Sequence, residues 1–366
     1  LPQGTKFLGV MKADAYGHGA VPVSRALADL VAEYLAVSNL EEAVQIRRGE
    51  VRLPILILGY TPAEYAANMI FLDITQEVHS LEYARELNEA LAGTNYILNV
   101  HLKLDTGMTR IGFFAYDNER TLDELRQVAQ LPHLHIEGVF MHFCVADSRA
   151  EADVSFTKLQ YKRFMDMLSA MAGVGIRPEI RHCCNSGATI LYPEFALDMV
   201  RPGIITYGNA PSDELEGALS LRPMMSLHSM IAQVRTVPAG TDISYGRLYR
   251  TKEETRVAVL PIGYADGLSR LLTGKASFYL QGHQVPVIGR ICMDMCMIDV
   301  SGVPEAKPGD VVTIFGYDDD GTLLPCERLA RAQGTINYEL LCQISKRIPR
   351  ICHRGAETSQ ILQYIV

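Results

Sequence analysis

A lysine followed by a glycine-rich turn stands near the start of the chain, in the segment Lys12–Gly19. The apolar run before Lys12 is typical of a buried β-strand. A lysine at the end of such a strand, where it is partly desolvated, can have a lowered pKa and form an imine with an aldehyde cofactor. A single lysine in this setting is more often an ordinary surface residue, so its interpretation depends on the residues that accompany it.

Six other polar residues and one glycine repeat the pattern of Lys12, because each ends or directly follows an apolar, β-rich run. They are Lys103, Asp105, His142, Asn185, Ser186, Arg201 and Gly203. In a parallel barrel the carboxyl ends of the strands meet at one face, and the active sites of such enzymes lie there. The spacing therefore predicts an enzyme site assembled from the ends of several strands.

Eight β-rich runs, most of them separated by helical patterns, must position these residues. The runs are Phe7–Met11, Tyr34–Ser38, Ile55–Leu58, Phe71–Thr75, Ile97–Leu104, Ile136–His142, Ile180–Cys184 and Met199–Ile204. The clearest helix is Ser80–Ala92, since Ser80 is a good N-cap, apolar residues share one face and Gly93 follows as a stop. Glu119–Leu131 and Phe156–Ala172 have the same pattern. Eight such units predict an α/β fold with a (β/α)8 TIM-like barrel.

The pattern changes after about residue 220, where strands and turns alternate with few helices. The predicted strands are Met225–Val237, Arg256–Ile262, Ala276–Leu280, Val285–Ile288, Cys292–Val300 and Val311–Phe315. We therefore expect two domains, a barrel in residues 1–220 that carries the cofactor and a mainly antiparallel β domain in residues 221–366.

Composition narrows the possible partners. The formal net charge is −8 and no basic stripe is present, which argues against nucleic acid as a partner. No apolar stretch is long enough to span a membrane, and eight scattered cysteines are expected to be reduced thiols, so we place the protein in the cytoplasm. Because the chain opens directly on a strand, we expect that something preceded Leu1, and a membrane portion there stays open. Four histidines without metal-ligand spacing, His18, His79, His101 and His133, are assigned structural roles, and no metal is expected.

The octet in Lys12–Gly19 resembles the cofactor-attachment segment of the alanine racemases, a fold-type III pyridoxal-phosphate family, with an aspartate at Asp14 where that segment has asparagine. Further segments resemble this family in the same order along the chain. They are His101–Gly112, His182–Thr189, Val200–Gly208, Ile243–Tyr249, Ile262–Gly267, Gly289–Val300 and Thr335–Glu339. The family normally begins with a strand and a helix before the lysine strand, and this chain lacks both.

The resemblance implies a role for each matching residue toward pyridoxal 5′-phosphate. Lys12 would carry the cofactor as an imine. Tyr16, Tyr338, Ser186, Gly203 and Ile204 would contact its phosphate, and Asn185 would be a further cofactor contact. Arg201 would face the pyridine nitrogen; because arginine stays protonated, the ring nitrogen would not, and side reactions such as transamination would be limited.

Three further residues of the barrel match family residues near the substrate. Arg110 would contact the phenolic oxygen of the cofactor and the substrate carboxylate. Lys103 matches a lysine that positions this arginine and is often carbamylated. His142 and Arg201 would form a relay that supports a tyrosinate.

Racemisation needs a base on each face of the substrate Cα, and the resemblance implies Lys12 and Tyr245. Since Tyr245 falls in the β domain, the family match implies a head-to-tail homodimer in which the partner supplies it. Met293 and Asp294 match a carboxylate pocket contributed by the partner, and an entry corridor would be formed by Tyr264, Arg270, Arg290 and Ile336. The implied reaction is the interconversion of L-alanine and D-alanine, which supplies D-alanine for peptidoglycan.

Several alternatives stay open. A serine/alanine racemase domain of a glycopeptide-resistance protein would share these residues. An amino-acid decarboxylase is disfavoured, because those families place a carboxylate where this chain has Arg201. A non-catalytic pyridoxal-phosphate carrier would lack the β domain that holds Tyr245, and the clustering at strand ends argues against a purely structural barrel.

Overall fold

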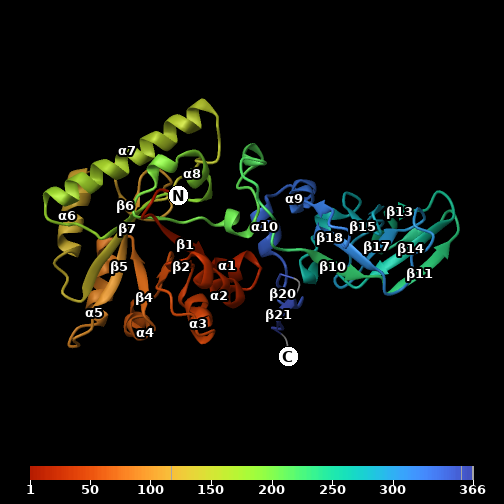
Figure 1. The fold of residues 1–366 in the computed structure, drawn as a ribbon, viewed down its shortest axis with the longest axis horizontal. Coiled ribbons are helices and arrows are strands. Elements are labelled where there is room, and N and C mark those ends of the chain that lie inside the picture. Colours follow the sequence, from red (N-terminus) through yellow and green to blue (C-terminus); the bar gives the residue numbers. More distant parts are fainter. Residues whose placement is uncertain (117, 356, 365–366) are drawn as a thin grey trace. The chain divides into compact units, whose positions relative to one another are not determined.

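A computed structural model describes residues 1–116, 118–355 and 357–364. The chain divides into two compact units (Figure 1). The first comprises Leu1–Ala15 and Ala20–Arg222, and the second comprises Tyr16–Gly19 and Pro223–Val366. The four residues after Ala15 thus belong to the second unit, although they follow Lys12 closely in the sequence.

The first unit is a closed barrel of eight parallel strands, as predicted. Its strands are β1 (Lys6–Val10), β2 (Tyr34–Val37), β3 (Ile55–Ile57), β4 (Ile74–Val78), β5 (Leu98–Asp105), β7 (Leu134–Phe140), β8 (Ile180–His182) and β9 (Met199–Val200). Neighbours pair in this order, and β9 returns to β1 through the pair Phe7 and Val200. A short strand, β6 (Phe113–Phe114), pairs with β5 outside the ring. Parallel strands end at the same face, so every strand-end residue named above lies at one mouth.

Helices connect the strands and lie around them (Figure 1). They are α2 (Ala20–Leu30), α3 (Leu40–Arg48), α4 (Ala66–Phe71), α5 (Leu81–Ala90), α6 (Asn118–Val128), α7 (Glu151–Gly173) and α8 (Ser186–Leu191). The predicted cap is present, since the Ser80 side chain accepts a hydrogen bond from the Tyr83 backbone N–H. Such a cap stabilises a helix by about 1 kcal/mol over alanine. The buried face of α5 is Leu81, Tyr83, Ala84 and Leu87.

Two predicted barrel strands differ from the observed strands by three residues or more at one or both ends. The fourth was expected at Phe71–Thr75, but Phe71 ends α4 with 71% of its surface exposed, and β4 begins at Ile74. The apolar run continues across the end of α4, so it does not mark this boundary. The rest of β4 was not predicted because it contains the buried polar residues Gln76 and Glu77. The eighth was expected to reach Ile204, which instead begins a 3-10 turn, η3 (Ile204–Tyr207).

The second unit contains mainly antiparallel sheets, also as predicted. One sheet has the order β10 (Leu227–Met230), β18 (Val311–Tyr317), β15 (Ser277–Leu280), β16 (His283–Pro286), with β19 (Leu323–Leu324) on β18. A second has the order β11 (Gln233–Val237), β14 (Thr255–Leu260), β17 (Cys296–Asp299). Two hairpins are β12 (Asp242–Ile243) with β13 (Tyr249–Arg250), and β20 (Arg350–Arg354) with β21 (Glu357–Leu362). Two helices complete the unit, α9 (Cys326–Gln333) and α10 (Asn337–Cys342).

The predicted strand Met225–Val237 is in fact two strands in different sheets. β10 pairs with β18, whereas β11 pairs with β14. Ile231, between them, is buried and its backbone N–H donates to the carbonyl of Asp310. Continuous β propensity does not reveal such a crossing, because both halves have the same residue pattern.

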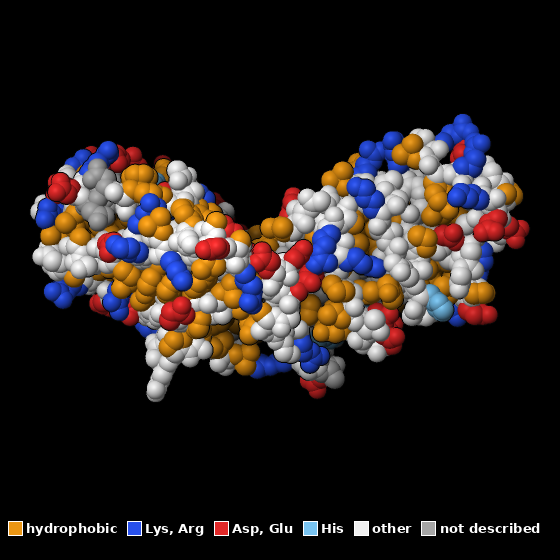
Figure 2. Space-filling view, turned by 90° about the horizontal axis from the view of Figure 1, so that it is seen from above, with side chains coloured by type: hydrophobic (Ala, Val, Ile, Leu, Met, Phe, Trp, Pro, Cys, Tyr) orange, Lys and Arg blue, Asp and Glu red, His pale blue; other side chains and the backbone are white. Residues whose placement is uncertain are grey.

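Within the described residues, no helix combines the length and apolar character needed to cross a membrane. On the face seen in Figure 2, Lys and Arg side chains lie among Asp and Glu side chains. The same part of the chain contains no disulfide, and all eight cysteines are thiols.

Candidate active site

The four residues directly after Lys12 form a left-handed turn, although none of these four is glycine. Ala13, Asp14 and Ala15 have φ near 55° and ψ near 49°, and Tyr16 has φ 51°. An L-residue in this conformation costs roughly 1–2 kcal/mol relative to the right-handed one. Lys12 itself is exposed at the barrel mouth. The structure thus presents the predicted lysine on a strained turn, and strain of this kind concentrates at functional sites.

Four cationic side chains converge on His142 at the mouth of the barrel. Burial lowers the pKa of His142 well below its usual range, and the positive charges around it lower it further. Those charges belong to Arg201, Lys103, Arg110 and Lys12. The structure therefore brings together five residues that the sequence assigned to one site. A cluster with this much positive charge favours anionic groups such as phosphate and carboxylate.

Arg201 is held rigidly by three acceptors. Nη1 lies 2.8 Å from Nδ1 of His182, and Nη2 donates to the carbonyls of Met141 at 2.7 Å and Cys183 at 3.2 Å. The side chain is 4% exposed, and burial lowers its pKa to about 10. It therefore stays protonated at neutral pH, as its predicted role requires.

A chain of buried imidazoles extends this contact into the barrel. Because a guanidinium only donates, Nδ1 of His182 accepts, and its Nε2 must donate to Nδ1 of His101 at 2.8 Å. Nε2 of His101 then donates to Glu137 at 3.1 Å. Glu137 also accepts from Tyr34 at 2.9 Å and from Thr75 at 3.2 Å.

The two imidazoles in this hydrogen-bonded series, those of His182 and His101, are neutral. Burial and the charge of Arg201 lower the pKa of His182, and burial lowers that of His101. Sequence reasoning missed His182 and Glu137 and gave His101 a purely structural role. The alternation of His101, Lys103 and Asp105 along β5 was the available signal, since alternate residues of a strand share one face.

Lys103 is a buried residue of the same barrel mouth. Burial, Arg201 and Arg110 lower the pKa of Lys103 to about 7, although Asp105 and Glu77 oppose the shift. Its Nζ donates to the Leu104 carbonyl at 3.0 Å. A large fraction of this amine is therefore neutral and nucleophilic near pH 7.

Asp105 builds the loop that carries Arg110. Its Oδ1 accepts from the backbone N–H groups of Gly107, Met108 and Thr109 at 2.9, 3.0 and 3.1 Å. Arg110 follows directly and is exposed at the mouth. A carboxylate that accepts several backbone N–H groups fixes a tight loop and hence the direction of the next side chain.

The last two strand ends place hydroxyl and amide donors together. Asn185 caps α8, since its Oδ1 accepts from the Ala188 N–H at 3.0 Å. Ser186, the first residue of α8, is 5% exposed, and its Oγ accepts from the Gly203 N–H at 2.9 Å. Ile204 follows and is fully buried. These two segments bring the Ser186 hydroxyl and the Gly203 backbone N–H together, as expected from the sequence.

The remaining predicted residues lie in the second unit. Tyr16 and Tyr338 are neighbours, with ring centroids 6.0 Å apart, and burial raises the pKa of Tyr16. A separate cavity of 640 Å³ is lined by Tyr245, Met293 and Asp294, among others. The backbone of Tyr264 is joined to that lining, because its N–H donates to the Cys292 carbonyl at 3.0 Å. Asp294 is paired with Arg347 at 2.9 Å.

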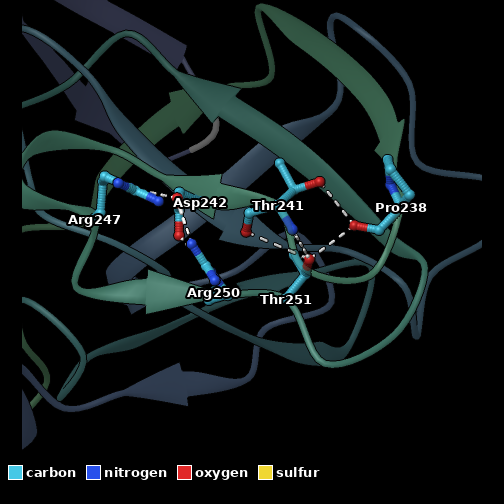
Figure 3. Close-up of polar contacts among 6 residues, drawn as sticks. All are labelled: Pro238, Thr241, Asp242, Arg247, Arg250 and Thr251. Atoms are coloured by element: carbon cyan, nitrogen blue, oxygen red, sulfur yellow. Dashed lines mark hydrogen bonds and ion pairs between the residues drawn. The ribbon is translucent and has the colours of Figure 1, made fainter.

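Tyr245 stands on the turn between β12 and β13, and a compact set of polar contacts braces this hairpin (Figure 3). Asp242 accepts from both Arg247 and Arg250, and these hydrogen bonds, that from Arg250 foremost, lower its pKa to about 2. Thr251 accepts from the Thr241 N–H at 2.9 Å and donates to the Pro238 carbonyl at 2.8 Å.

Apolar packing and backbone geometry complete the support of this turn. Beneath it, Ile243 packs with Val257 and Ile288. Gly246 has φ 74°, and a Cβ there would lie 2.8 Å from the guanidinium of Arg290. The Tyr245 side chain itself is 68% exposed and so is available to a further surface.

Among the described residues, no group of three or more histidine, cysteine, aspartate or glutamate side chains is arranged to hold a metal ion.

Comparison with known proteins identifies the relatives of this chain. The family model "Alanine racemase, N-terminal domain" matches residues 1–211, and "Alanine racemase, C-terminal domain" matches residues 224–352. An alanine racemase of Desulfovibrio desulfuricans is 46% identical over 351 residues, which are 96% of this chain and 92% of that protein. One of Clostridium tetani is 42% identical over 365 residues, which are 99% of this chain and 93% of that protein.

Solved structures give the same result. An alanine racemase of Clostridium difficile 630 superposes with a TM-score of 0.94 at 40% identity, covering 100% of this chain and 94% of that one. One from Bacillus anthracis, with bound L-Ala-P, has a TM-score of 0.93 at 34% identity and covers 100% and 92%.

Proposed function

Because this chain belongs to the alanine racemase family, we propose that it interconverts L-alanine and D-alanine with pyridoxal 5′-phosphate held on Lys12. The observation that carries the proposal is the convergence of Lys12, Arg110, Lys103 and Arg201 on His142 at one barrel mouth. An amine poised on a strained turn, next to fixed positive charge, suits an aldehyde that carries an anionic phosphate.

The donor set fits this cofactor. The Ser186 hydroxyl and the Gly203 N–H already lie 2.9 Å apart, and both are suited to phosphate oxygens. Asn185 and Ile204 flank them, and Tyr16 and Tyr338 are the proposed further phosphate contacts. Arg201, anchored by His182, would face the ring nitrogen without giving up its proton. When bound, the cofactor supplies an electron sink for the pair left behind as the α-proton departs.

Two side chains would move the α-proton. Lys12 takes or returns it on one face, and Tyr245 of a second copy of the chain does so on the other. Ionising a tyrosine near neutral pH is costly against its usual pKa of about 10, so nearby positive charge must help. Arg201 is the proposed source of that charge, and the neutral imidazole of His142 beside it is the proposed relay, because its ring nitrogen can accept a hydrogen bond from the tyrosine hydroxyl.

The substrate carboxylate would be bound by charge and shape. Arg110, fixed by the Asp105 loop, offers a guanidinium fork for it. Met293 and Asp294, which share a cavity with Tyr245, would close the pocket from the second copy. Tyr264, Arg270, Arg290 and Ile336 would line the entry. A head-to-tail homodimer is therefore part of the proposal.

Lys103 is the proposed site of carbamylation. A pKa of about 7 leaves much of the amine neutral, which is the form that reacts with carbon dioxide. The resulting carbamate is anionic, and the neighbouring charges of Arg110 and Arg201 would stabilise it. Its role would be to orient Arg110.

The alternatives left open by the sequence are not favoured. Relatives over nearly the whole chain are named alanine racemase, and the match to the C-terminal domain argues against a non-catalytic barrel carrier. We propose that the protein works in the cytoplasm and supplies D-alanine for peptidoglycan.

The test is isotope exchange in deuterated water with L-alanine and L-serine added separately to cofactor-loaded protein. D-alanine carrying deuterium at Cα is the expected product. Faster formation of D-serine would move the assignment to the serine-type enzymes, and no exchange from either amino acid would refute the proposal.

A further inference from the structure

The left-handed turn after Lys12 needs support from outside itself. Ala13, Asp14 and Ala15 all have positive φ, and none of these residues favours that region as glycine does. Such a turn persists only where surrounding contacts hold it. Those contacts therefore decide in which direction the residue before it, Lys12, projects.

One carboxylate binds the turn directly. Oε1 of Glu42 accepts from the Ala13 N–H at 2.7 Å, and its Oε2 accepts from the Ser38 N–H at 2.7 Å. Ser38 follows the end of strand β2, which pairs with the lysine strand β1. A single carboxylate thus ties the residue after Lys12 to the neighbouring strand end.

A second side chain of the same helix binds the next residue. Gln45, three positions after Glu42, donates from Nε2 to Oδ1 of Asp14 at 3.3 Å. Residues three apart on a helix lie on one face, so α3 presents both groups to the turn. Oδ1 of Asp14 also accepts from the Ala20 N–H at 2.7 Å, which joins the turn to the start of α2.

Helix α3 is itself anchored by hydrogen bonds at both ends. Its first turn is capped by Asn39, whose side chain accepts from the Glu42 N–H at 3.0 Å. At its other end Arg47 donates to four backbone carbonyls, those of Val51, Leu53, Leu72 and Asp73, at 2.7–2.8 Å. An acidic residue in the first turn is also favoured by the helix dipole.

We propose that Glu42 is a positioning residue that holds the left-handed turn and thereby aims the Lys12 amine at the cofactor aldehyde. The inference rests on the proposed function in one respect, namely that Lys12 is the amine that reacts. The positioning role requires both carboxylate oxygens of Glu42, because each accepts a different backbone N–H. Glutamine has one acceptor oxygen and cannot satisfy both donors.

The test measures imine formation separately from cofactor binding. Apo-protein is mixed with pyridoxal 5′-phosphate, and the imine absorbance is followed in the parent and in Glu42→Gln. We expect the variant to form the imine about tenfold more slowly, the effect of losing roughly one charge-assisted hydrogen bond. Glu41→Gln is the matched control: Glu41 is an exposed carboxylate in the same helical turn, and this variant should react at the parental rate.

Two further comparisons distinguish positioning from general loss of structure. In a Lys12→Ala background, addition of Glu42→Gln should leave the dissociation constant for non-covalent cofactor binding unchanged. Ala13→Gly should restore the rate in Glu42→Gln, because glycine adopts φ 54° without a side-chain penalty. If Glu42→Gln fails to fold, Gln45→Ala removes the neighbouring contact to Asp14, leaves the Asn39 cap in place and should slow the reaction more mildly.

An unchanged rate of imine formation in Glu42→Gln, or no recovery with Ala13→Gly, would overturn the inference. If the parent protein formed no imine at all, the proposed function would fail instead. In that case amide hydrogen exchange tests the positioning role independently of the proposed function. Faster exchange at Ala13 in apo Glu42→Gln than in the parent supports the role, and equal exchange refutes it.

Discussion

Replacing Glu137 by glutamine should weaken the barrel and loosen Arg201 through two intervening imidazoles. The carboxylate accepts three hydrogen bonds, from His101, Tyr34 and Thr75, at 2.9–3.2 Å. Burial raises the pKa of Glu137, but the hydrogen bond from His101 and those from the two hydroxyl donors outweigh burial and hold the pKa below its usual value. Glutamine keeps the shape but removes the charge, and its amide N–H groups would face donors.

The magnitude follows from these contacts. A hydrogen bond to a charged group contributes about 1.5–3 kcal/mol, and the side chain is partly exposed, so we expect a loss of about 2 kcal/mol in the free energy of unfolding. For a domain of this size that loss corresponds to a fall in Tm of about 4–8 °C. Calorimetry of the apo-protein measures it, with Glu179→Gln as control, since Glu179 is an exposed carboxylate just before β8.

The pH dependence gives a sharper check of the same reasoning. Because the folded-state pKa of Glu137 lies below 4.5, its stabilising effect is fully present above pH 4.5 and is lost as pH falls through the folded value. The difference in Tm between parent and Glu137→Gln should therefore be constant near neutral pH and shrink below pH 4.5. Equal melting temperatures at pH 7, or a difference that grows in acid, would refute the assigned network.

Four further outcomes are expected. Unfolding free energy should fall as pH drops below 6.5, because His101, His142 and His182 have lowered pKa values, are neutral when folded and take up protons on unfolding; a stability curve that is flat from pH 7 to pH 5 would contradict this. Carbamylation at Lys103, read as a gain of carbon dioxide by native mass spectrometry, should rise as pH increases through about 7, and carbon-dioxide-free buffer should abolish it. Gly112→Ala should cost more than about 2 kcal/mol, since φ is 129° and a Cβ would lie 2.8 Å from the Lys103 carbonyl, whereas Gly93→Ala, with open space around it, should cost less. Mixed dimers of inactive Lys12→Ala and Tyr245→Phe should regain activity, and no gain after confirmed subunit exchange would exclude a shared site.

The sequence predicts the features that depend on local pattern. Eight apolar runs with intervening helical periods were sufficient to predict the barrel, and Ser80 was sufficient to predict the start of α5. Strand ends predicted that Lys12, Lys103, His142 and Arg201 would meet, and the charges acting on His142 agree with that prediction.

Features that depend on register or on strain were not predictable in this way. The contact of His182 with His101 needs the closed barrel and a register shift in β5 between Val100 and His101, which no propensity scale reports. The left-handed turn was missed because alanine does not favour positive φ, and the contacts that hold it, such as that from Glu42 about thirty residues away, are not local in the sequence. β4 was misplaced because its interior carries Gln76 and Glu77 in place of apolar residues.

The most direct test of the central claim is borohydride reduction of the cofactor-loaded protein followed by peptide mass spectrometry. We expect one reduced pyridoxyl-phosphate adduct, on the peptide that contains Lys12, and none in Lys12→Ala. An adduct on Lys103 or on another lysine, or none in the parent protein, would contradict this expectation.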